Sequence, residues 1–142
     1  HAGAFAIIVC CGYFLAAFGI WTEAGAEDIG VLAVGFILSR ALNGFGICTF
    51  PCAKNSGLAA TFAQAADRKR CQIVLVIEIL LCIAGMLLIG PLRGTTAAVA
   101  AVVVCLCCRR MAIKTFGGIT GDIQGFFQQI CELTMAYVVI LQ

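Results

Sequence analysis

Residues 2–21 read AGAFAIIVCCGYFLAAFGIW and contain no charged side chain. A helix of about 20 mostly apolar residues is long enough to cross the hydrocarbon core of a bilayer. Further windows of this kind, apolar to differing degrees, cover Ile29 to Phe50, Gln72 to Gly90, Gly94 to Cys108 and Ile123 to Leu141. They lack the two-residue alternation of barrel strands. We therefore expect an all-α, polytopic transmembrane bundle of about five spans.

The composition of the whole chain agrees with a membrane protein. Apolar residues make up 63% of the 142 positions and charged residues 11%, with a mean hydropathy of +1.09. Soluble domains carry about 25% charged residues. The net charge of +2 is too small to favour a nucleic-acid partner, so the expected partner is the lipid bilayer.

Basic residues are concentrated in two of the predicted loops, which predicts the orientation. One loop holds Lys54, Arg68, Lys69 and Arg70, and the other holds Arg109, Arg110 and Lys114. The remaining loops hold the acidic stretch TEAGAED (22–28) and a lone Arg93. By the positive-inside rule the two basic loops are cytoplasmic. We expect a multi-pass protein of the cell membrane with His1 at its cytoplasmic face and Gln142 outside. The short fourth window is expected to use Arg109 and Arg110 as snorkelling ends.

The ten cysteines are interpreted as small apolar residues. Most lie inside the apolar windows, and neither the CLCC stretch at 105–108 nor the pair Cys48 and Cys52 is joined by a second pair at zinc-site spacing. Disulfides are not expected at the cytoplasmic ends of the spans.

Polar residues inside the windows are the first candidates for function, because a charge at the bilayer centre costs at least about 2.5 kcal/mol and needs a partner or a wet cavity. On one side of the second window lie Ser39, Arg40 and Asn43. One face of the last window carries Asp122, Gly125, Gln129 and Glu132, at spacings of three and four.

The stretch FGGITGD (116–122) joins the fourth window to the fifth and leaves two interpretations open. Glycines can turn several N–H groups toward one anion, the helix that follows adds its positive end, and Asp122 could hold a Mg²⁺ ion that bridges to a phosphate. The stretch can equally be a plain glycine-rich turn in which Asp122 caps the helix.

Several motifs together resemble the cobalamin synthase family of membrane enzymes. In order along essentially the whole chain, these are HAGAFA (1–6), SRALN (39–43), NSGLAATFAQA (55–65) and GGITGDIQG (117–125) followed by Glu132. GGITGD is the most specific of them. The resemblance implies a fold like that of the CDP-alcohol phosphotransferases, a requirement for Mg²⁺, and a reaction that joins adenosylcobinamide-GDP to α-ribazole or its 5′-phosphate with release of GMP.

The resemblance and the polar faces of the two windows together predict roles for individual residues. Asp122 and Arg40 are the expected catalytic residues, with Asp122 also a metal ligand. The expected substrate-binding residues are Ser39, Asn43, Gly117, Gly118, Thr120, Gly121, Gln129, Glu132 and Gly3. Gln129 stands where many members have glutamate, so it is not expected to bind metal. The acidic metal motif of the family has no counterpart here. Residues 1–142 are therefore expected to be one transmembrane domain, the C-terminal part of a longer enzyme that needs its upstream half for activity.

Alternatives remain open for the whole chain and for Arg40. A lipid-directed CDP-alcohol phosphotransferase is the nearest rival enzyme. A small transporter subunit, with Arg40, Glu78 and Glu132 along a solute path, is the non-enzymatic alternative. Arg40 either neutralises substrate phosphate or forms a buried ion pair with Glu132. A homo-oligomer is compatible with the sequence.

Overall fold

The computed structural model describes residues 3–53 and 67–142, and the regular structure within these ranges is helical. The helices are α1 (Ala4–Thr22), α2 (Ala26–Thr49), α4 (Arg68–Ile89), α5 (Pro91–Phe116) and α6 (Gly121–Ile140). The prediction of an all-α chain is confirmed. His1, Lys54 and the NSGLAATFAQA segment lie outside the described residues.

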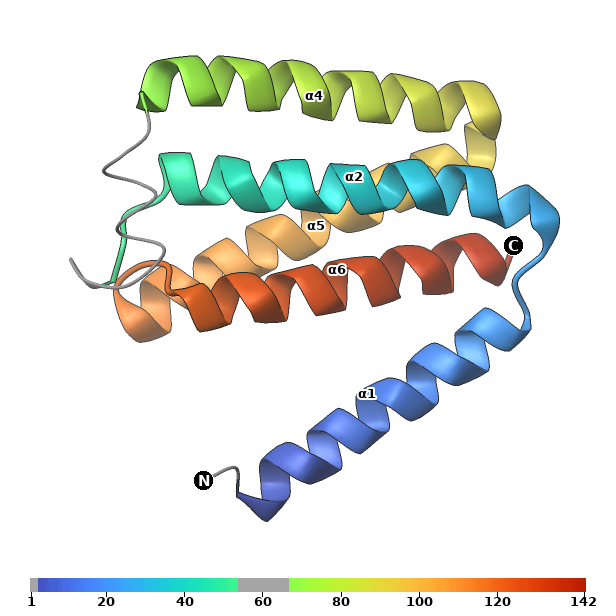
Figure 1. Cartoon of the computed structure of the whole chain (residues 1–142), viewed down its shortest axis with the longest axis horizontal. Helices are drawn as coiled ribbons and strands as arrows, with labels where there is room; N and C mark the ends of the chain where they lie inside the picture. The colour runs from blue at the N-terminus through green and yellow to red at the C-terminus, as the bar shows by residue number, and fades with distance from the viewer. Residues whose placement is uncertain (1–2, 54–66) are drawn as a thin grey trace.

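Four of the described helices, α1, α2, α4 and α5, are long and apolar enough to cross a membrane. Length and apolar content therefore agree with four of the about five predicted spans, whereas α6 is not apolar enough to be counted as a fifth. Its polar residues, which include Asp122, Gln124, Gln128, Gln129 and Glu132, lower its hydropathy. With 20 residues α6 is nevertheless about 30 Å long, and it runs beside α2 and α5 between the same two ends of the bundle (Figure 1).

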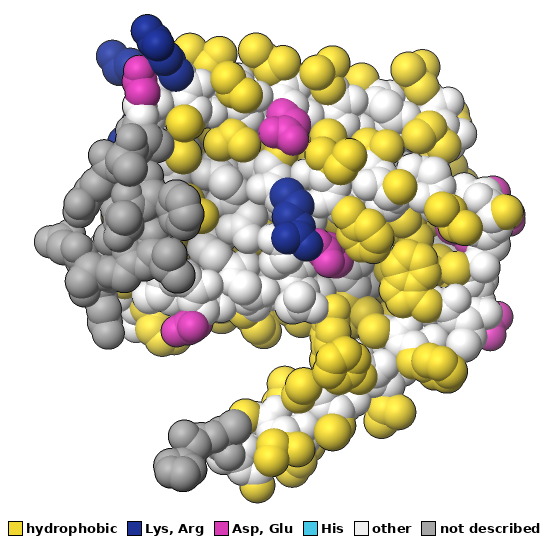
Figure 2. All heavy atoms as spheres, viewed as in Figure 1, with side chains coloured by type: hydrophobic (Ala, Val, Ile, Leu, Met, Phe, Trp, Pro, Cys, Tyr) yellow, Lys and Arg dark blue, Asp and Glu magenta, His cyan; other side chains and the backbone are white. Residues whose placement is uncertain are grey.

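Helices α4, α2 and α6 lie side by side, and α5 crosses behind α2 and α6 (Figure 1). The core between them is apolar and includes Leu38 from α2, Met86 from α4, Ala101 from α5 and Met135 from α6. Cys82, Cys108 and Cys131 belong to the same core, which confirms their interpretation as small apolar residues. The outer surface is largely apolar as well (Figure 2), as expected for helices that face lipid.

Helix α5 is longer than the window Gly94 to Cys108 predicted. It starts with Pro91 at its first position, continues through Arg109 and Arg110, and ends at Phe116, with Gly117 as its C-terminal cap. Proline at the start and glycine just past the end are the usual helix boundaries, whereas the hydropathy window stops where the charges begin. Gly94 brings α5 against the end of α4, because a Cβ at this position would collide with the carbonyl of Met86.

The ends of α2 and α5 farthest from the Gly117 junction are joined by an ion pair. Asp28 has only 4% of its side chain exposed, and its Oδ1 lies 3.1 Å from Nε of Arg93. The other carboxylate oxygen of Asp28 accepts a hydrogen bond of 2.9 Å from the N–H of Gly25, just before α2 begins. Asp28 thus caps one helix while it binds another.

Helix α1 diverges from the other helices (Figure 1) and has no buried residue. Its C-terminal part contacts them: Ile20 packs on the core, and the Trp21 ring lies 6.1 Å from the Phe36 ring. A cleft of about 490 Å³ separates α1 from α6, lined by Leu15, Ala16, Gly19, Ile20, Leu133, Thr134 and Tyr137. We call it the α1–α6 cleft.

Candidate functional site

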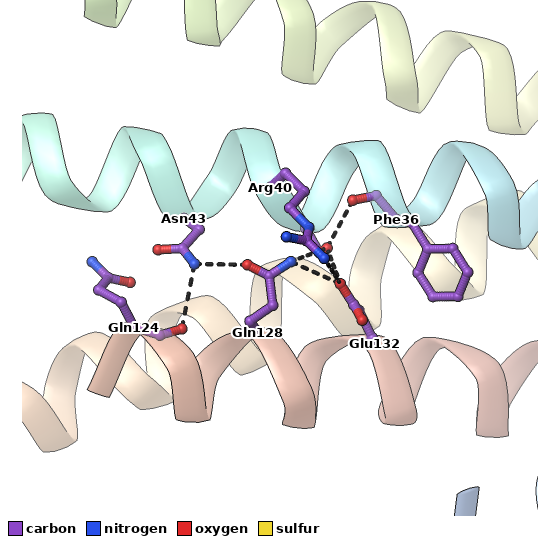
Figure 3. Close-up of polar contacts among 7 residues, drawn as sticks. Phe36, Arg40, Asn43, Gln124, Gln128 and Glu132 are labelled. Atoms are coloured by element: carbon purple, nitrogen blue, oxygen red, sulfur yellow. Dashed lines mark hydrogen bonds and ion pairs between the residues drawn. The ribbon is translucent and has the colours of Figure 1, made fainter. Parts of the chain in front are cut away.

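Helices α2 and α6 face each other through polar side chains near the middle of the bundle (Figure 3). Oε1 of Glu132 accepts a hydrogen bond from Ser39 Oγ at 3.0 Å and another from Gln128 Nε2 at 2.7 Å. Oε1 of Gln128 accepts from Asn43 Nδ2 at 2.8 Å. These four residues form a continuous hydrogen-bonded group, which we call the α2–α6 network.

Helical spacing explains why these four side chains meet. Ser39 and Asn43 are four residues apart on α2, and Gln128 and Glu132 are four apart on α6, so each pair lies on one side of its helix. Ser39 is fully buried and Gln128 is 8% exposed. Buried polar groups of this kind are costly unless they are hydrogen-bonded. The network is therefore a specific contact that fixes the register of α6 against α2.

Arg40 lies at the outer edge of the network. Its Nη2 is 3.7 Å from Oε1 of Glu132, which confirms that the two residues pair. The pair is not the buried bridge that one alternative expected, because 71% of the Arg40 side chain is exposed against 17% of Glu132. The pair is not enclosed by protein, so the cost expected for breaking a bridge buried in a protein core does not apply. Most of the guanidinium remains accessible to another anion.

The Gly117–Gly118 turn ends α5. Gly117 adopts the left-handed conformation, with φ of 73°, and its N–H donates to the Ile113 carbonyl at 3.1 Å. The N–H of Gly118 donates to the Ala112 carbonyl at 3.2 Å. Both glycine N–H groups thus satisfy the end of a helix and are not directed toward a ligand.

The next residue joins the turn to the segment after α2. The N–H of Ile119 donates to the Pro51 carbonyl at 2.8 Å, and its own carbonyl accepts from the Ala53 N–H at 2.9 Å. A Cβ on Gly118 would lie 2.5 Å from the Pro51 oxygen, which is closer than real contacts allow. Gly118 is therefore required by packing. The expected array of N–H groups around an anion is reduced to those at the start of α6.

Thr120, and not Asp122, caps α6. The hydroxyl of Thr120 accepts a hydrogen bond of 3.3 Å from the Ile123 N–H. Asp122 follows in the first turn with its side chain exposed, where a carboxylate is stabilised by the helix dipole. The N–H groups of Gly121 and Asp122 have no partner within α6, as is general for a first turn. The alternative in which Asp122 caps the helix is wrong, while its role as a ligand stays a prediction.

The other expected site residues lie apart from the α2–α6 network. Gln129 is exposed, in line with Asp122 and Gly125 along α6. Gly3 precedes α1 at the end of that helix farthest from its contacts with the core. Asp122 and Glu132 are ten positions apart, a rise of about 15 Å along α6. The expected convergence of Arg40 and Asp122 is therefore not formed among the described residues and stays a prediction.

Sequence reasoning missed Gln124 and Gln128. Gln128 is the centre of the network, and the backbone carbonyl of Gln124 accepts a 3.3 Å hydrogen bond from Asn43 Nδ2. The signal was present, because Gln124, Gln128 and Glu132 recur every four residues and therefore form a second polar stripe on α6.

The described residues alone do not fit a complete magnesium site. They contain no group of three or more His, Cys, Asp or Glu side chains placed to hold a metal ion. Mg²⁺ takes six oxygen ligands and is usually bound through one or two carboxylates together with substrate phosphates and waters. Asp122 offers one such carboxylate, and the predicted Mg²⁺ requirement stays a prediction.

Comparison with known proteins gives a consistent result along the whole chain. The family model described as cobalamin-5-phosphate synthase matches residues 1–140. A curated adenosylcobinamide-GDP ribazoletransferase from Lachnoclostridium phytofermentans is 37% identical over 141 residues. That alignment covers 99% of this chain and 54% of the relative, so the chain spans about half the length of the curated relative it matches. No solved structure matches.

Proposed function

The chain belongs to the cobalamin-5-phosphate synthase family, and from this premise we propose that it forms part of a membrane transferase of cobalamin biosynthesis. The proposed reaction joins adenosylcobinamide-GDP to α-ribazole or its 5′-phosphate. We propose this activity for a polypeptide as long as the relative, of which the present chain spans about half. The observation that carries the proposal is the α2–α6 network: it joins Ser39 and Asn43 of the SRALN motif to Gln128 and Glu132, which follow GGITGDIQG, in a chain 37% identical to a curated adenosylcobinamide-GDP ribazoletransferase.

The proposed step is a phosphoryl transfer. A hydroxyl of the ribazole attacks the phosphorus next to cobinamide, the bond to the bridging oxygen of the diphosphate breaks, and GMP leaves with that oxygen. The hydroxyl proton passes to solvent or to a base. Enzymes catalyse such steps mainly by positioning the reactants and stabilising the charge on the phosphate oxygens.

Arg40 is proposed to bind the diphosphate. Its guanidinium is largely exposed, and Glu132 contacts it through one nitrogen at 3.7 Å. Ser39 and Gln128 hold the Glu132 carboxylate that faces it. A planar guanidinium can bind two phosphate oxygens in parallel, which a lysine ammonium cannot do. The arrangement therefore supports a role for Arg40 that lysine would not replace.

Asp122 is proposed to give one ligand to a Mg²⁺ ion whose other ligands come from beyond the described residues. The rise of about 15 Å between Asp122 and Glu132 is longer than a diphosphate. The roles of Asp122 and Arg40 are therefore tested separately.

We further propose that the protein lies in the cell membrane with its active face in the cytoplasm. The support is the distribution of charge: Lys69, Arg70 and Lys114 belong to the ends of α4 and α5 near the Gly117 junction, whereas Glu23, Glu27 and Asp28 lie around the start of α2.

The test is turnover by the full-length protein that carries this chain, purified and monodisperse, across a Mg²⁺ titration. Arg40→Lys is expected to lower kcat by at least tenfold without changing the Mg²⁺ requirement, and Asp122→Asn to raise the Mg²⁺ concentration needed for half-maximal rate. Arg110→Lys, at an exposed position of α5, is the matched control and should behave as wild type. Near-normal rates for both site variants would contradict the proposal.

A further inference from the structure

The side of the molecule formed by α2, α4 and α6 carries charge halfway between the two ends of the bundle. Arg40 is the only cation of α2, and Glu78 is the only carboxylate of α4. Figure 2 shows Lys/Arg and Asp/Glu side chains together in the middle of this side, surrounded by apolar ones. We call this surface, with Arg40, Glu78 and Glu132, the charged face.

The charged face is a poor surface for lipid. An ionised side chain at the bilayer centre costs at least about 2.5–3.5 kcal/mol. The Arg40 side chain is 71% exposed, and its contact with Glu132 is long, at 3.7 Å. Glu78 has no ion pair or hydrogen bond within the described ranges. Two ionisable side chains at mid-depth therefore need further polar partners.

The neighbouring side of α6 is also uncovered. Asp122, Gly125 and Gln129 are exposed along it, and Thr134 and Tyr137 continue the same helix into the α1–α6 cleft. The opposite wall of the cleft is α1, which has no buried residue. Helices in a membrane associate through close packing and hydrogen bonds, and α1 gains little of either from the described residues.

The outer side of α5 is different. Between Val99 and Leu106 its exposed positions include Val99, Val103 and Leu106, without a charge among them, and its exposed cations begin only at Arg109. Such a surface needs no protein partner in lipid. Among the described residues, the uncovered polar surface at mid-depth therefore lies on the charged face and at the α1–α6 cleft, whereas the exposed cations of α5 gather at its basic end.

We propose that one continuous interface packs on the charged face beside Glu78, leaves the Arg40 guanidinium open to substrate and fills the α1–α6 cleft, and that its occupant is a membrane-embedded helical segment of the same polypeptide. The matched part of the ribazoletransferase is a C-terminal portion, and nearly half of that protein lies outside the match. In a polypeptide of the relative's length, those further residues are available to pack against the matched part. The unpaired Glu78 requires that the occupant bring a cationic or hydrogen-bond-donating side chain to mid-depth. The inference rests on the family and not on the roles proposed for Arg40 and Asp122.

The experiment is photocrosslinking in native membranes, using the full-length polypeptide that carries this chain. p-Benzoylphenylalanine replaces Tyr137 in the cleft, Ile37 on α2 one turn from Arg40, or Val103 on the outer side of α5 as the matched control. All three positions are exposed apolar or aromatic side chains. Adducts are identified by mass spectrometry as peptide or lipid.

The expected result is a crosslink from positions 137 and 37 to peptides of the same polypeptide upstream of the matched region, with lipid adducts at position 103. Lipid adducts at 137 and 37, as at 103, would overturn the proposal, and so would crosslinks between two copies. Because the readout is independent of turnover, failure of this proposal is distinguishable from failure of the transferase proposal.

Discussion

Gly118 lies where two backbone segments approach too closely for a side chain. Gly118→Ala is expected to destabilise the protein by about 1–3 kcal/mol, because its Cβ would lie 2.5 Å from the Pro51 carbonyl oxygen and 2.6 Å from the Ala53 nitrogen. The free energy of unfolding is measured by denaturant titration in mixed micelles. Gly121→Ala is the matched control, since a Cβ there meets nothing within 4 Å. Equal stability of the two variants would show that the contact with Pro51 is not required.

Gln128 and Gln129 are neighbours in sequence with different surroundings, which provides a second matched pair. Gln128→Leu removes hydrogen bonds to Ser39, Asn43 and Glu132, and we expect a loss of about 1–3 kcal/mol of stability. Hydrogen bonds inside membranes often contribute less, so a value near the lower end is expected. Gln129→Leu is exposed and should stay within about 0.5 kcal/mol of wild type.

These two variants also separate structure from substrate binding. If Gln129 contacts substrate, Gln129→Leu loses turnover while its unfolding curve is unchanged. If Gln128→Leu were as stable as wild type, the α2–α6 network would not be holding α6 in register.

For individual residues, the sequence predicted that Ser39, Asn43 and Glu132 have polar partners or face a wet cavity, because polar residues in apolar windows need them. It could not identify which side of α6 faces α2. That helix carries polar residues on two sides, and only packing of Phe127, Cys131 and Met135 into the core decides between them. The pairing of Arg40 with Glu132 was one of two alternatives, and its exposed position could not be derived from spacing.

Among the helices, hydropathy located all five described ones but did not fix their ends. The α5 window ended at Cys108, although Gly117 is the residue that ends the helix. Charged side chains at a membrane surface lower hydropathy without breaking a helix. Conversely, α6 was accepted as a fifth span although its polar stripes leave it short of the apolar content of the other four.

The ion pair between Arg93 and Asp28 joins the ends of α5 and α2, and its contribution to stability can be measured. Arg93→Met is expected to cost about 1–3 kcal/mol, because the Asp28 carboxylate is buried and would lose a charged partner. Glu27→Gln is the control: Glu27 also contacts Arg93, at 3.6 Å, but its side chain is 62% exposed and should contribute little. Thermal unfolding in detergent distinguishes the two. A larger effect for Glu27→Gln would mean that the buried carboxylate is not the partner that matters.

For the whole molecule, the testable feature is its orientation. We expect a single cysteine at Thr115, in a background with the ten native cysteines replaced, to resist membrane-impermeant thiol reagents in intact cells. Thr115 is exposed at the basic end, near Lys114. A cysteine at Glu23, between α1 and α2, should react readily. The reverse pattern would invert the proposed topology. A similar probe at position 56 lies outside the described residues.

The polar residues of α6 affect how this helix is inserted into the membrane during synthesis of the protein. On the translocon scale, an acidic residue at the centre of a helix adds about 2.5–3.5 kcal/mol to the free energy of insertion, and Glu132 lies near the middle of α6. Emerging from the ribosome by itself, α6 would partition poorly into lipid. Once α2 and α5 are already in the membrane, Ser39 and Asn43 offer hydrogen-bond partners that lower this cost. The helix that carries Asp122 and Glu132 is therefore expected to enter the bilayer late and against protein, so that assembly of the candidate site and completion of membrane insertion are one event.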